Sequence, residues 1–235
     1  MNKLDLKIVM PVYNEELNIE KVIADWITEL RKLKMSFKLF AYNDGSKDAT
    51  RDKLELLKQN YPELNAIHKE NSGHGPTLLT GYQDRTPSEW IFQVDSDDEM
   101  SPAYFHLLWN ERKNYDFLIG YRTNRHSPLP RKIISFISRF TVTLFYGSGV
   151  YDVNSPYRLF KTAFFDQLIA KIPSDTFAPN VILSGLASLY QARCKSFDIP
   201  HSERKLGEVS IKKWKLVKAA MKSFYQTIRY RFTLN

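Results

Sequence analysis

Cysteine is nearly absent from this 235-residue chain, and acidic residues are missing from two long stretches of it. The single cysteine, Cys194, excludes an internal disulfide, which suits a reducing compartment. The N-terminal segment lacks an uninterrupted apolar run of signal-peptide length, so we expect no export. Internal repeats and low-complexity tracts are also missing, and the length favours one well-buried domain.

The two stretches without acids are basic. Five Lys or Arg residues lie between residues 117 and 151, and seven lie between residues 209 and 235. The rest of the chain carries 22 basic and 26 acidic residues, although the net charge of the whole chain is +8. Such basic regions suit phosphate groups, nucleic acid or an anionic membrane surface as partners. Because the basic residues form no recognisable nucleic-acid-binding motif, we expect no nucleic acid partner.

The first half of the chain alternates strand-like and helix-like segments. Strands are expected at 6–10, 37–42, 66–68, 90–94 and 117–121, and helices at 17–33, 48–59, 77–82 and 101–112. The last helix begins with Ser101 as N-cap and Pro102 in the first turn. Strands separated by helices predict an α/β fold with a single, mostly parallel sheet flanked by helices.

The second half of the chain is less regular. Strands are expected at 152–160 and 195–199, and helices at 133–146, 163–171 and 181–190. The segment 133–146 is apolar around most of its circumference. It is too short to cross a bilayer, which needs about 20 residues in a helix.

The C-terminal segment, residues 209–235, has the periodicity of an amphipathic helix. Its apolar residues recur at spacings of three and four, and Lys and Arg occupy much of the remaining surface. The apolar residues are Ile211, Trp214, Val217, Met221, Phe224, Ile228 and Phe232. One interpretation is a helix docked on the body with a solvated basic face. The segment contains no acids, and aromatic residues lie on its apolar side. Both observations favour the other interpretation, an anchor lying in the plane of a membrane.

An acidic cluster, QVDSDDE, follows the predicted strand at 90–94. In extended chain Asp95 and Asp97 share one face, and Glu99 continues the alternation. Carboxylates just beyond the carboxyl end of a strand lie where open α/β sheets bind ligands. They would hold Mg²⁺ or Mn²⁺, which bridges carboxylates and substrate phosphates. Taken alone, the cluster is equally compatible with a solvated acidic turn.

Three other polar loops follow the preceding predicted strands, and their sequences are MPVYNEE, NDGSKDAT and NSGHGPTLLTGY. In the third loop, Gly73 and Gly75 would let the backbone approach a ligand closely. Each loop alone could be an ordinary turn. Their order along the chain, with the acidic cluster fourth, predicts a single site at the carboxyl ends of the strands.

These motifs together resemble the family-2 glycosyltransferases, which have the GT-A fold. The resemblance rests on PVYNEE at 11–16, NDGSKDAT at 43–50, the glycine pattern at 71–81 and DSDDE at 95–99. Within the family the chain looks most like the polyprenol- or dolichol-phosphate sugar (mannose or glucose) synthases. That narrower resemblance rests on GYR at 120–122, RKIIS at 131–135, DVNSPYRLF at 152–160 and IPHSERKLGE at 199–208.

The resemblance implies a Rossmann-like, GT-A-type catalytic domain over residues 1–208, followed by the amphipathic helix at 209–235. It also implies metal-dependent, inverting transfer of a sugar from a GDP- or UDP-sugar to a polyprenyl or dolichyl phosphate. Such a protein would be cytoplasmic and peripheral on the inner face of a membrane. It would contact the membrane through residues 133–146 and 211–235.

The resemblance further implies roles for individual residues. The nucleotide-sugar pocket would be lined by Pro11, Tyr13, Glu15, Asn43, Asp44, Gly73, His74 and Asp95. Asp95, Asp97 and Glu99 would hold Mg²⁺ or Mn²⁺. The acceptor phosphate would bind Arg122, Arg131 and Ser135, because guanidinium groups contact phosphate bidentately. Asp95, Asp97, Arg122 and Arg131 form the expected catalytic set, although the two arginines could instead be surface or membrane-facing charges.

Several positions depart from the family pattern. Asn43 stands where Asp is common, and His74 stands where a basic residue is usual. Pro156 replaces a glycine, and Asp98 and Glu99 stand where the synthases have Leu and Gln. These departures leave the base of the nucleotide and the third metal ligand open.

The acceptor is predicted from a missing acid. Transfer to a hydroxyl needs a general base, often a carboxylate, and such relatives usually carry an acidic pair in the second half. Here that region reads SDTFAPNVILSG, with Asp175 as its single acid. A phosphate monoester, with a second pKa of about 6, is already a nucleophile at neutral pH. The sequence therefore favours a phosphate acceptor.

Two alternatives remain at this point. The first is a hydroxyl or glycan acceptor, with Asp152 or Asp175 as the base. The second is a non-enzymatic basic module that binds a membrane or nucleic acid, which the sequence pI of about 9.4 favours. Against this module, the acidic loop would repel phosphate groups if no metal were bound.

Overall fold

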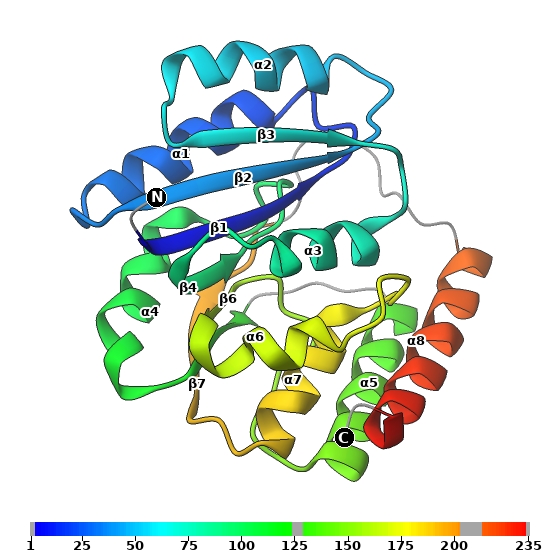
Figure 1. The fold of residues 1–235 in the computed structure, drawn as a ribbon. Helices are drawn as coiled ribbons and strands as arrows, with labels where there is room; N and C mark the ends of the chain where they lie inside the picture. The colour runs from blue at the N-terminus through cyan, green and yellow to red at the C-terminus, as the bar shows by residue number, and fades with distance from the viewer. Residues whose placement is uncertain (1–2, 124–128, 203–212, 234–235) are drawn as a thin grey trace.

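The computed structural model describes residues 3–123, 129–202 and 213–233, which form one seven-stranded sheet with helices on both faces (Figure 1). The strand order is β3-β2-β1-β4-β6-β5-β7. The strands are β1 (Leu4–Val12), β2 (Phe37–Asp44), β3 (Leu64–Lys69), β4 (Ser88–Gln93), β5 (Phe117–Thr123), β6 (Arg158–Lys161) and β7 (Cys194–Pro200). The α-helices are α1 (Ile19–Arg31), α2 (Thr50–Asn60), α3 (His74–Gln83), α4 (Phe105–Glu111), α5 (Leu129–Tyr146), α6 (Thr162–Ala170), α7 (Pro179–Leu189) and α8 (Lys213–Thr233).

The sheet is mostly parallel, as the alternation of strands and helices predicted. β1 pairs in parallel with both β2 and β4, β2 with β3, and β5 with β7. β6 runs antiparallel to its neighbours β4 and β5. The carboxyl ends of β1, β2, β3 and β4 therefore lie at one edge of the sheet, where parallel α/β sheets bind ligands.

Each face of the sheet has its own apolar core. On one face α1 buries Ile23, Trp26 and Ile27, and the spacings of three and four from Ile23 place them on one side of the helix. The Trp26 ring lies 5.3 Å from the ring of Phe92 in β4. On the other face α3, α6 and α7 pack around residues such as Phe160. Burial of one such phenyl side chain contributes about 2–3 kcal/mol to folding, so both layers hold the sheet firmly.

Two predicted elements are wrong in extent. The strand expected at 152–160 is confined to Arg158–Lys161, because residues 152–157 form a loop. In that loop the backbone N–H groups of Asn154 and Ser155 donate to the Asp152 side chain and carbonyl, respectively, and Pro156 has no N–H to donate to a ladder. The helix expected at 101–112 is divided into a 3₁₀ turn (Pro102–Tyr104), α4 and a second 3₁₀ turn (Arg112–Asn114).

The N-cap prediction for Ser101 is confirmed, since its hydroxyl oxygen accepts a hydrogen bond from the backbone N–H of Ala103 over 3.3 Å. A side-chain acceptor at this position satisfies a backbone donor that the first helical turn leaves unpaired. The capped 3₁₀ turn, Pro102–Tyr104, follows the acidic cluster closely in the chain, so the cap defines where regular structure begins after that cluster.

The C-terminal helix α8 docks on the body beside α5 and α7 (Figure 1). The Tyr146 hydroxyl donates to the carbonyl of Thr227 over 2.6 Å, and Arg231 Nε donates to the carbonyl of Phe145 over 2.7 Å. Gln226 is buried, and its Oε1 accepts from the backbone N–H of Phe177 over 2.8 Å. Polar groups with precise partners therefore hold α8 in place.

The face by which α8 docks differs from the apolar face that its periodicity defines. Gln226, Thr227 and Tyr230 are buried against the body, whereas Met221 and Phe232 are 68% and 66% exposed. Of the other predicted apolar residues, Ile211 and the side chains of Trp214 and Val217 lie outside the described residues. In the part of the chain that the structure describes, no helix combines the length and the apolar character needed to cross a membrane.

Candidate active site

The loops that follow β1 and β2 brace one another at the carboxyl edge of the sheet. Asn14 adopts a left-handed backbone conformation (φ 53°), and its side-chain carbonyl accepts from the N–H of Lys47 over 2.8 Å. The backbone N–H of Glu15 donates to the Thr50 hydroxyl over 2.8 Å. These two hydrogen bonds tie the loops to one another shortly before α1 and α2 begin.

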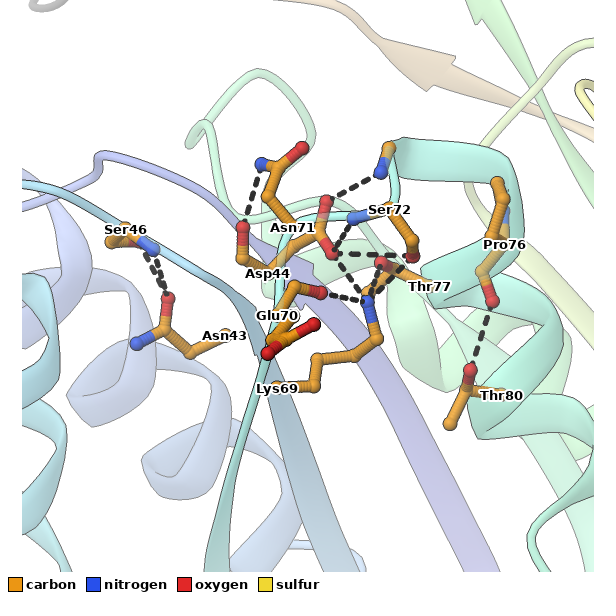
Figure 2. A network of polar contacts seen from close by, with 11 residues as sticks. Asn43, Asp44, Ser46, Lys69, Glu70, Asn71, Ser72, Pro76, Thr77 and Thr80 are labelled. Atoms are coloured by element: carbon orange, nitrogen blue, oxygen red, sulfur yellow. Dashed lines mark hydrogen bonds and ion pairs between the residues drawn. The ribbon is translucent and has the colours of Figure 1, made fainter.

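Asp44, at the end of β2, organises the glycine loop (Figure 2). Its Oδ1 accepts from Lys69 Nζ (2.5 Å) and from the Ser72 N–H (2.9 Å), and its Oδ2 accepts from the Gly73 N–H (2.8 Å). Burial alone would raise the pKa of Asp44, but the hydrogen bonds from Lys69, Ser72 and Gly73 outweigh it and the pKa lies below its ordinary value. The carboxylate therefore anchors the glycine loop to the end of β2.

Asn43, the residue before, is 2% exposed and has partners on both sides of its amide. Its Oδ1 accepts from the hydroxyl of Ser46 over 2.6 Å, and its Nδ2 lies 3.0 Å from Nδ1 of His68. His68 Nε2 lies 2.8 Å from a carboxylate oxygen of Glu55 in α2. The position that departs from the family pattern is thus held by a hydrogen-bond chain reaching into the neighbouring helix.

Gly75 lies where α3 begins against the turn at 175–177. A Cβ at this position would lie 2.1 Å from the carbonyl oxygen of Phe177 and 2.4 Å from that of Thr176. Any larger residue would push the start of α3 off this turn. The same turn is held from the other side by Gln226 of α8.

His74 and Asp95 face one another across the site. His74 Nε2 lies 3.9 Å from Oδ1 of Asp95, and the His74 side chain is 56% exposed. The loop after β4 also contacts the loop after β1, because the Ser96 hydroxyl donates to the carbonyl of Pro11 over 2.9 Å. The structure thus brings the glycine loop, the first loop and the acidic cluster to the same edge of the sheet.

The acidic cluster divides into separate environments. Asp98 forms an ion pair with Lys21 of α1 at 2.8 Å, and Glu99 Oε2 lies 2.8 Å from Nε2 of His201. Among the described residues, no group of three or more His, Cys, Asp or Glu side chains is placed to hold a metal ion. Asp95 and Asp97 nevertheless offer the hard oxygen donors that Mg²⁺ and Mn²⁺ prefer. One or two carboxylates with substrate phosphates and waters are a usual ligand set for Mg²⁺.

Arg122, near the end of β5, and Asp152, in the loop before β6, form an ion pair. Arg122 Nε and Nη2 donate to the two carboxylate oxygens of Asp152 over 2.8 and 2.9 Å, and both side chains are largely buried. Ser135 lies on α5, and Arg131 lies in the first turn of that helix with its side chain outside the described residues. The motif at 199–208 is described as far as Ser202.

We predicted no role for His201, which lies directly after β7. Its backbone N–H donates to the carbonyl of Thr123, and its imidazole is buried against Glu99. His201 Nδ1 has no hydrogen-bond partner within the described residues. A histidine after a predicted strand was the available signal, but its partner lies 102 residues earlier.

The fold is shared with solved glycosyltransferases. Glucosyl-3-phosphoglycerate synthase from Mycobacterium tuberculosis, in complex with phosphoglyceric acid, superposes with a TM-score of 0.69 at 14% identity, covering 99% of this chain and 81% of that one. The same protein with Mn²⁺, UDP and glucosyl-3-phosphoglycerate gives a TM-score of 0.67 with the same coverage and identity. At this identity the likeness shows the fold, which is the GT-A fold expected from the motifs.

The family model for glycosyl transferase family 2 matches residues 7–169. That span covers the sheet from β1 to β6 and contains the four loops described above. The chain belongs to glycosyl transferase family 2.

Curated relatives are longer than this chain. An undecaprenyl-phosphate 4-deoxy-4-formamido-L-arabinose transferase of Proteus mirabilis is 23% identical over 216 residues, covering 90% of this chain and 64% of that protein. The protein of the same name from Pseudomonas fluorescens (strain ATCC BAA-477) is 23% identical over 215 residues, with 90% and 62% covered. An uncharacterized glycosyltransferase of Synechocystis is 27% identical over 144 residues, which is 61% of this chain and 43% of that protein.

Proposed function

We propose that this protein transfers a sugar from a nucleotide-sugar to the phosphate of a polyprenyl phosphate at a membrane surface, with a divalent metal on the donor diphosphate. The observation that carries the donor half is the meeting of Asp95 and His74 with the glycine loop at one edge of the sheet. Relatives named as undecaprenyl-phosphate sugar transferases, covered over 90% of this chain, support the acceptor half.

On the donor side, Pro11, Tyr13 and Glu15 would line the nucleotide pocket together with Asn43 and the loop that Asp44 anchors. The amides at the start of α3 would face the diphosphate, since the N-terminus of a helix favours anions. Mg²⁺ or Mn²⁺ held by Asp95 and Asp97 would offset the charge that builds on the leaving nucleoside diphosphate. Glu99 would support this ligand set from its contact with His201.

On the acceptor side, the pair of Arg122 and Asp152 favours a phosphate over a hydroxyl. Both carboxylate oxygens of Asp152 accept from Arg122, so the carboxylate is already engaged as a partner of a cation. A phosphate needs no base to become a nucleophile, and it would be attracted by Arg122 and Arg131. Ser135, on the second turn of α5, would donate its hydroxyl to the same phosphate.

The membrane surface would be formed by the exposed faces of α5 and α8. Large apolar side chains on these two neighbouring helices are at least 42% exposed. They are Ile133, Phe136, Ile137, Phe140, Leu144, Met221, Phe224, Tyr225 and Phe232. Lys132, Lys218, Lys222 and Arg229 are exposed on the same helices, and such mixtures of apolar and basic residues bind anionic lipid surfaces. This face would place the protein on the inner leaflet as a peripheral protein.

A transfer assay tests the proposal. Labelled GDP- and UDP-sugars are incubated with the protein, Mn²⁺ or Mg²⁺, and a short polyprenyl phosphate in detergent. The expected result is metal-dependent product that extracts into organic solvent and is absent with Asp97→Asn. Donor binding without any lipid product would contradict the acceptor half and leave a hydroxyl acceptor, with Asp175 as the candidate base. Absence of metal-dependent nucleotide binding would contradict the donor half.

A further inference from the structure

A buried chain of hydrogen bonds reaches Asp95 from the protein interior. Gln93, the last residue of β4, donates from Nε2 to Oδ1 of Asp95 over 3.2 Å. On the other side of its amide, Gln93 Oε1 accepts from the hydroxyl of Tyr82 in α3 over 2.7 Å. Gln93 is completely buried and Tyr82 is 2% exposed, so bulk water does not compete for these bonds.

Elementary hydrogen-bond chemistry fixes the direction of this chain. An ionised carboxylate can only accept, so Gln93 must turn its NH₂ group to Asp95 and its carbonyl to Tyr82. The Tyr82 hydroxyl has a single hydrogen, and Oε1 of Gln93 at 2.7 Å is closer than Oδ1 of Asn180 at 2.9 Å. Gln93 is therefore held in one amide orientation and presents a fixed donor to the Asp95 carboxylate.

The far end of the chain is anchored by Arg158, whose side chain is completely buried. Its Nη1 donates to the carbonyl of Asn180 over 2.8 Å, which ties the chain to α7. Its Nε donates to the carbonyl of Ser155 over 2.9 Å, in the loop that begins with Asp152. One buried guanidinium thus supports the partner of Tyr82 and the loop that carries the partner of Arg122.

We propose that Tyr82 and Gln93 are positioning residues for Asp95: they fix the direction of its carboxylate so that it could bind the metal carried by the donor diphosphate. This inference rests on the proposed function, because the role of Asp95 as a ligand is itself proposed. Neither residue would touch the donor or the metal. Outer hydrogen-bond partners of metal ligands typically change metal affinity or activity by about 10–100-fold when removed. A merely structural pair of buried polar groups would affect folding and leave metal affinity unchanged.

The test compares two conservative substitutions. Tyr82→Phe removes the hydroxyl that orients Gln93, whereas Tyr146→Phe removes an equally buried tyrosine hydroxyl that donates to α8. The dissociation constant of Mn²⁺ is measured by electron paramagnetic resonance in the presence of UDP or GDP, beside kcat and KM for the donor. We expect Tyr82→Phe to raise the Mn²⁺ dissociation constant about tenfold, and Gln93→Met to raise it at least as much. Tyr146→Phe should leave it unchanged.

A ligand-free measurement separates this inference from the proposed function. The side-chain amide resonances of Gln93, assigned with Gln93→Met, should be slow to exchange with water and should shift in both Tyr82→Phe and Asp95→Asn. If the Gln93 amide resonances respond to neither change, the proposed hydrogen-bond chain from Tyr82 to Asp95 is refuted, whatever the protein binds. If the wild type binds Mn²⁺ and Tyr82→Phe binds it equally well, the positioning role of Tyr82 and Gln93 is refuted and the proposed function stands. If the wild type binds no Mn²⁺ with either nucleotide, the proposed function fails and the role given to Asp95 fails with it.

Discussion

Arg122 and Asp152 meet through two parallel hydrogen bonds of 2.8 and 2.9 Å, although they lie 30 residues apart in the sequence. The two residues belong to different motifs, at the end of β5 and in the loop before β6. The sequence predicted two separate roles, a phosphate-binding arginine and a candidate base. In the structure these two residues are direct partners.

Arg122→Lys should lower sugar transfer by at least tenfold while nucleotide affinity stays within about twofold. A lysine ammonium cannot make the bidentate contact that the guanidinium makes with Asp152, and the loop at 152–157 would lose its fixed position. Steady-state transfer and calorimetric titration with UDP or GDP measure the two effects. Equal losses in donor affinity and transfer would show that the pair belongs to the donor side.

Asp152→Asn provides the complementary test of the base hypothesis. Because it leaves the Arg122 charge buried without its partner, we expect the free energy of unfolding to fall by about 3 kcal/mol. Urea unfolding measures this loss. If Asp152 were the general base for a hydroxyl acceptor, transfer would vanish even where the protein remains folded, and added azide or formate would restore part of it.

Asp97→Ala should abolish metal-dependent nucleotide binding without unfolding the protein. Asp97 is partly exposed at the carboxyl edge of the sheet, so its removal leaves no cavity in either apolar core. Calorimetric titration with UDP or GDP, with and without Mn²⁺, measures the loss. Asp25→Ala, on α1, is a control that removes another partly exposed carboxylate. Full metal-dependent binding in Asp97→Ala would refute the metal assignment.

Lys7, in β1, should make stability depend on pH in the alkaline range. Burial lowers the pKa of Lys7 to about 8, against the opposing effect of the Asp84 and Asp166 charges. Because the unfolded chain holds this proton up to about pH 10.4, it binds more protons than the folded chain between pH 8 and 10, and stability rises with pH there. The slope contributed by Lys7 is at most about 1.4 kcal/mol per pH unit.

Urea unfolding at pH 7.5 and pH 9.5 measures this dependence. Lys7→Met removes the titrating group, so its stability should lack the rise that Lys7 contributes. The free energy of unfolding of the wild type, relative to that of Lys7→Met, should therefore be larger at pH 9.5 than at pH 7.5. Lys38→Met is a matched control. Lys38 is also a strand lysine, in β2, but its Nζ donates to the Pro62 carbonyl in an exposed contact. An identical pH dependence of the wild type and Lys7→Met would show that Lys7 has its ordinary pKa.

Replacing both Phe136 and Phe140 by Ser should weaken binding to anionic vesicles. The two rings stack with centroids 6.4 Å apart and are 69% and 57% exposed on α5. Sedimentation with vesicles of phosphatidylglycerol measures the effect, for which we expect at least a tenfold loss of affinity, since each buried phenyl group contributes about 2 kcal/mol. Leu56→Ser, on α2, changes an equally exposed apolar residue away from this face. Loss with Leu56→Ser as large as with the α5 variant would argue against a defined membrane surface.

The elements of the first half could be predicted from the sequence because their signals are local. Alternating and three-to-four spacings, together with loops such as NDGSKDAT, located the elements from β1 to β4 and gave the correct order of the loops. The parallel pairing then placed Asp44 and Asp95 at one edge. The family model independently covers the same segment.

The remaining features depend on contacts between distant residues, which local patterns do not encode. Glu99 was predicted from its spacing to Asp97, but its contact with His201 crosses 102 residues. The strand expected at 152–160 was too long, because apolar alternation in this segment conceals a loop that Pro156 and the Asp152 turn impose. The docking face of α8 was missed because Gln226 and Thr227, which hold it, are polar residues that periodicity assigns to the solvent side.

Gln226 links the C-terminal helix α8 to the start of α3. It holds the turn at 175–177 by two hydrogen bonds, accepting from the Phe177 N–H and donating to the Asp175 carbonyl. That turn lies so close to Gly75, at the start of α3, that a Cβ at Gly75 would clash with it. Loss of α8 would thus also remove the two hydrogen bonds that hold this turn beside the start of α3. Removal of α8 would therefore be felt at the glycine loop as well as on the surface that α8 covers.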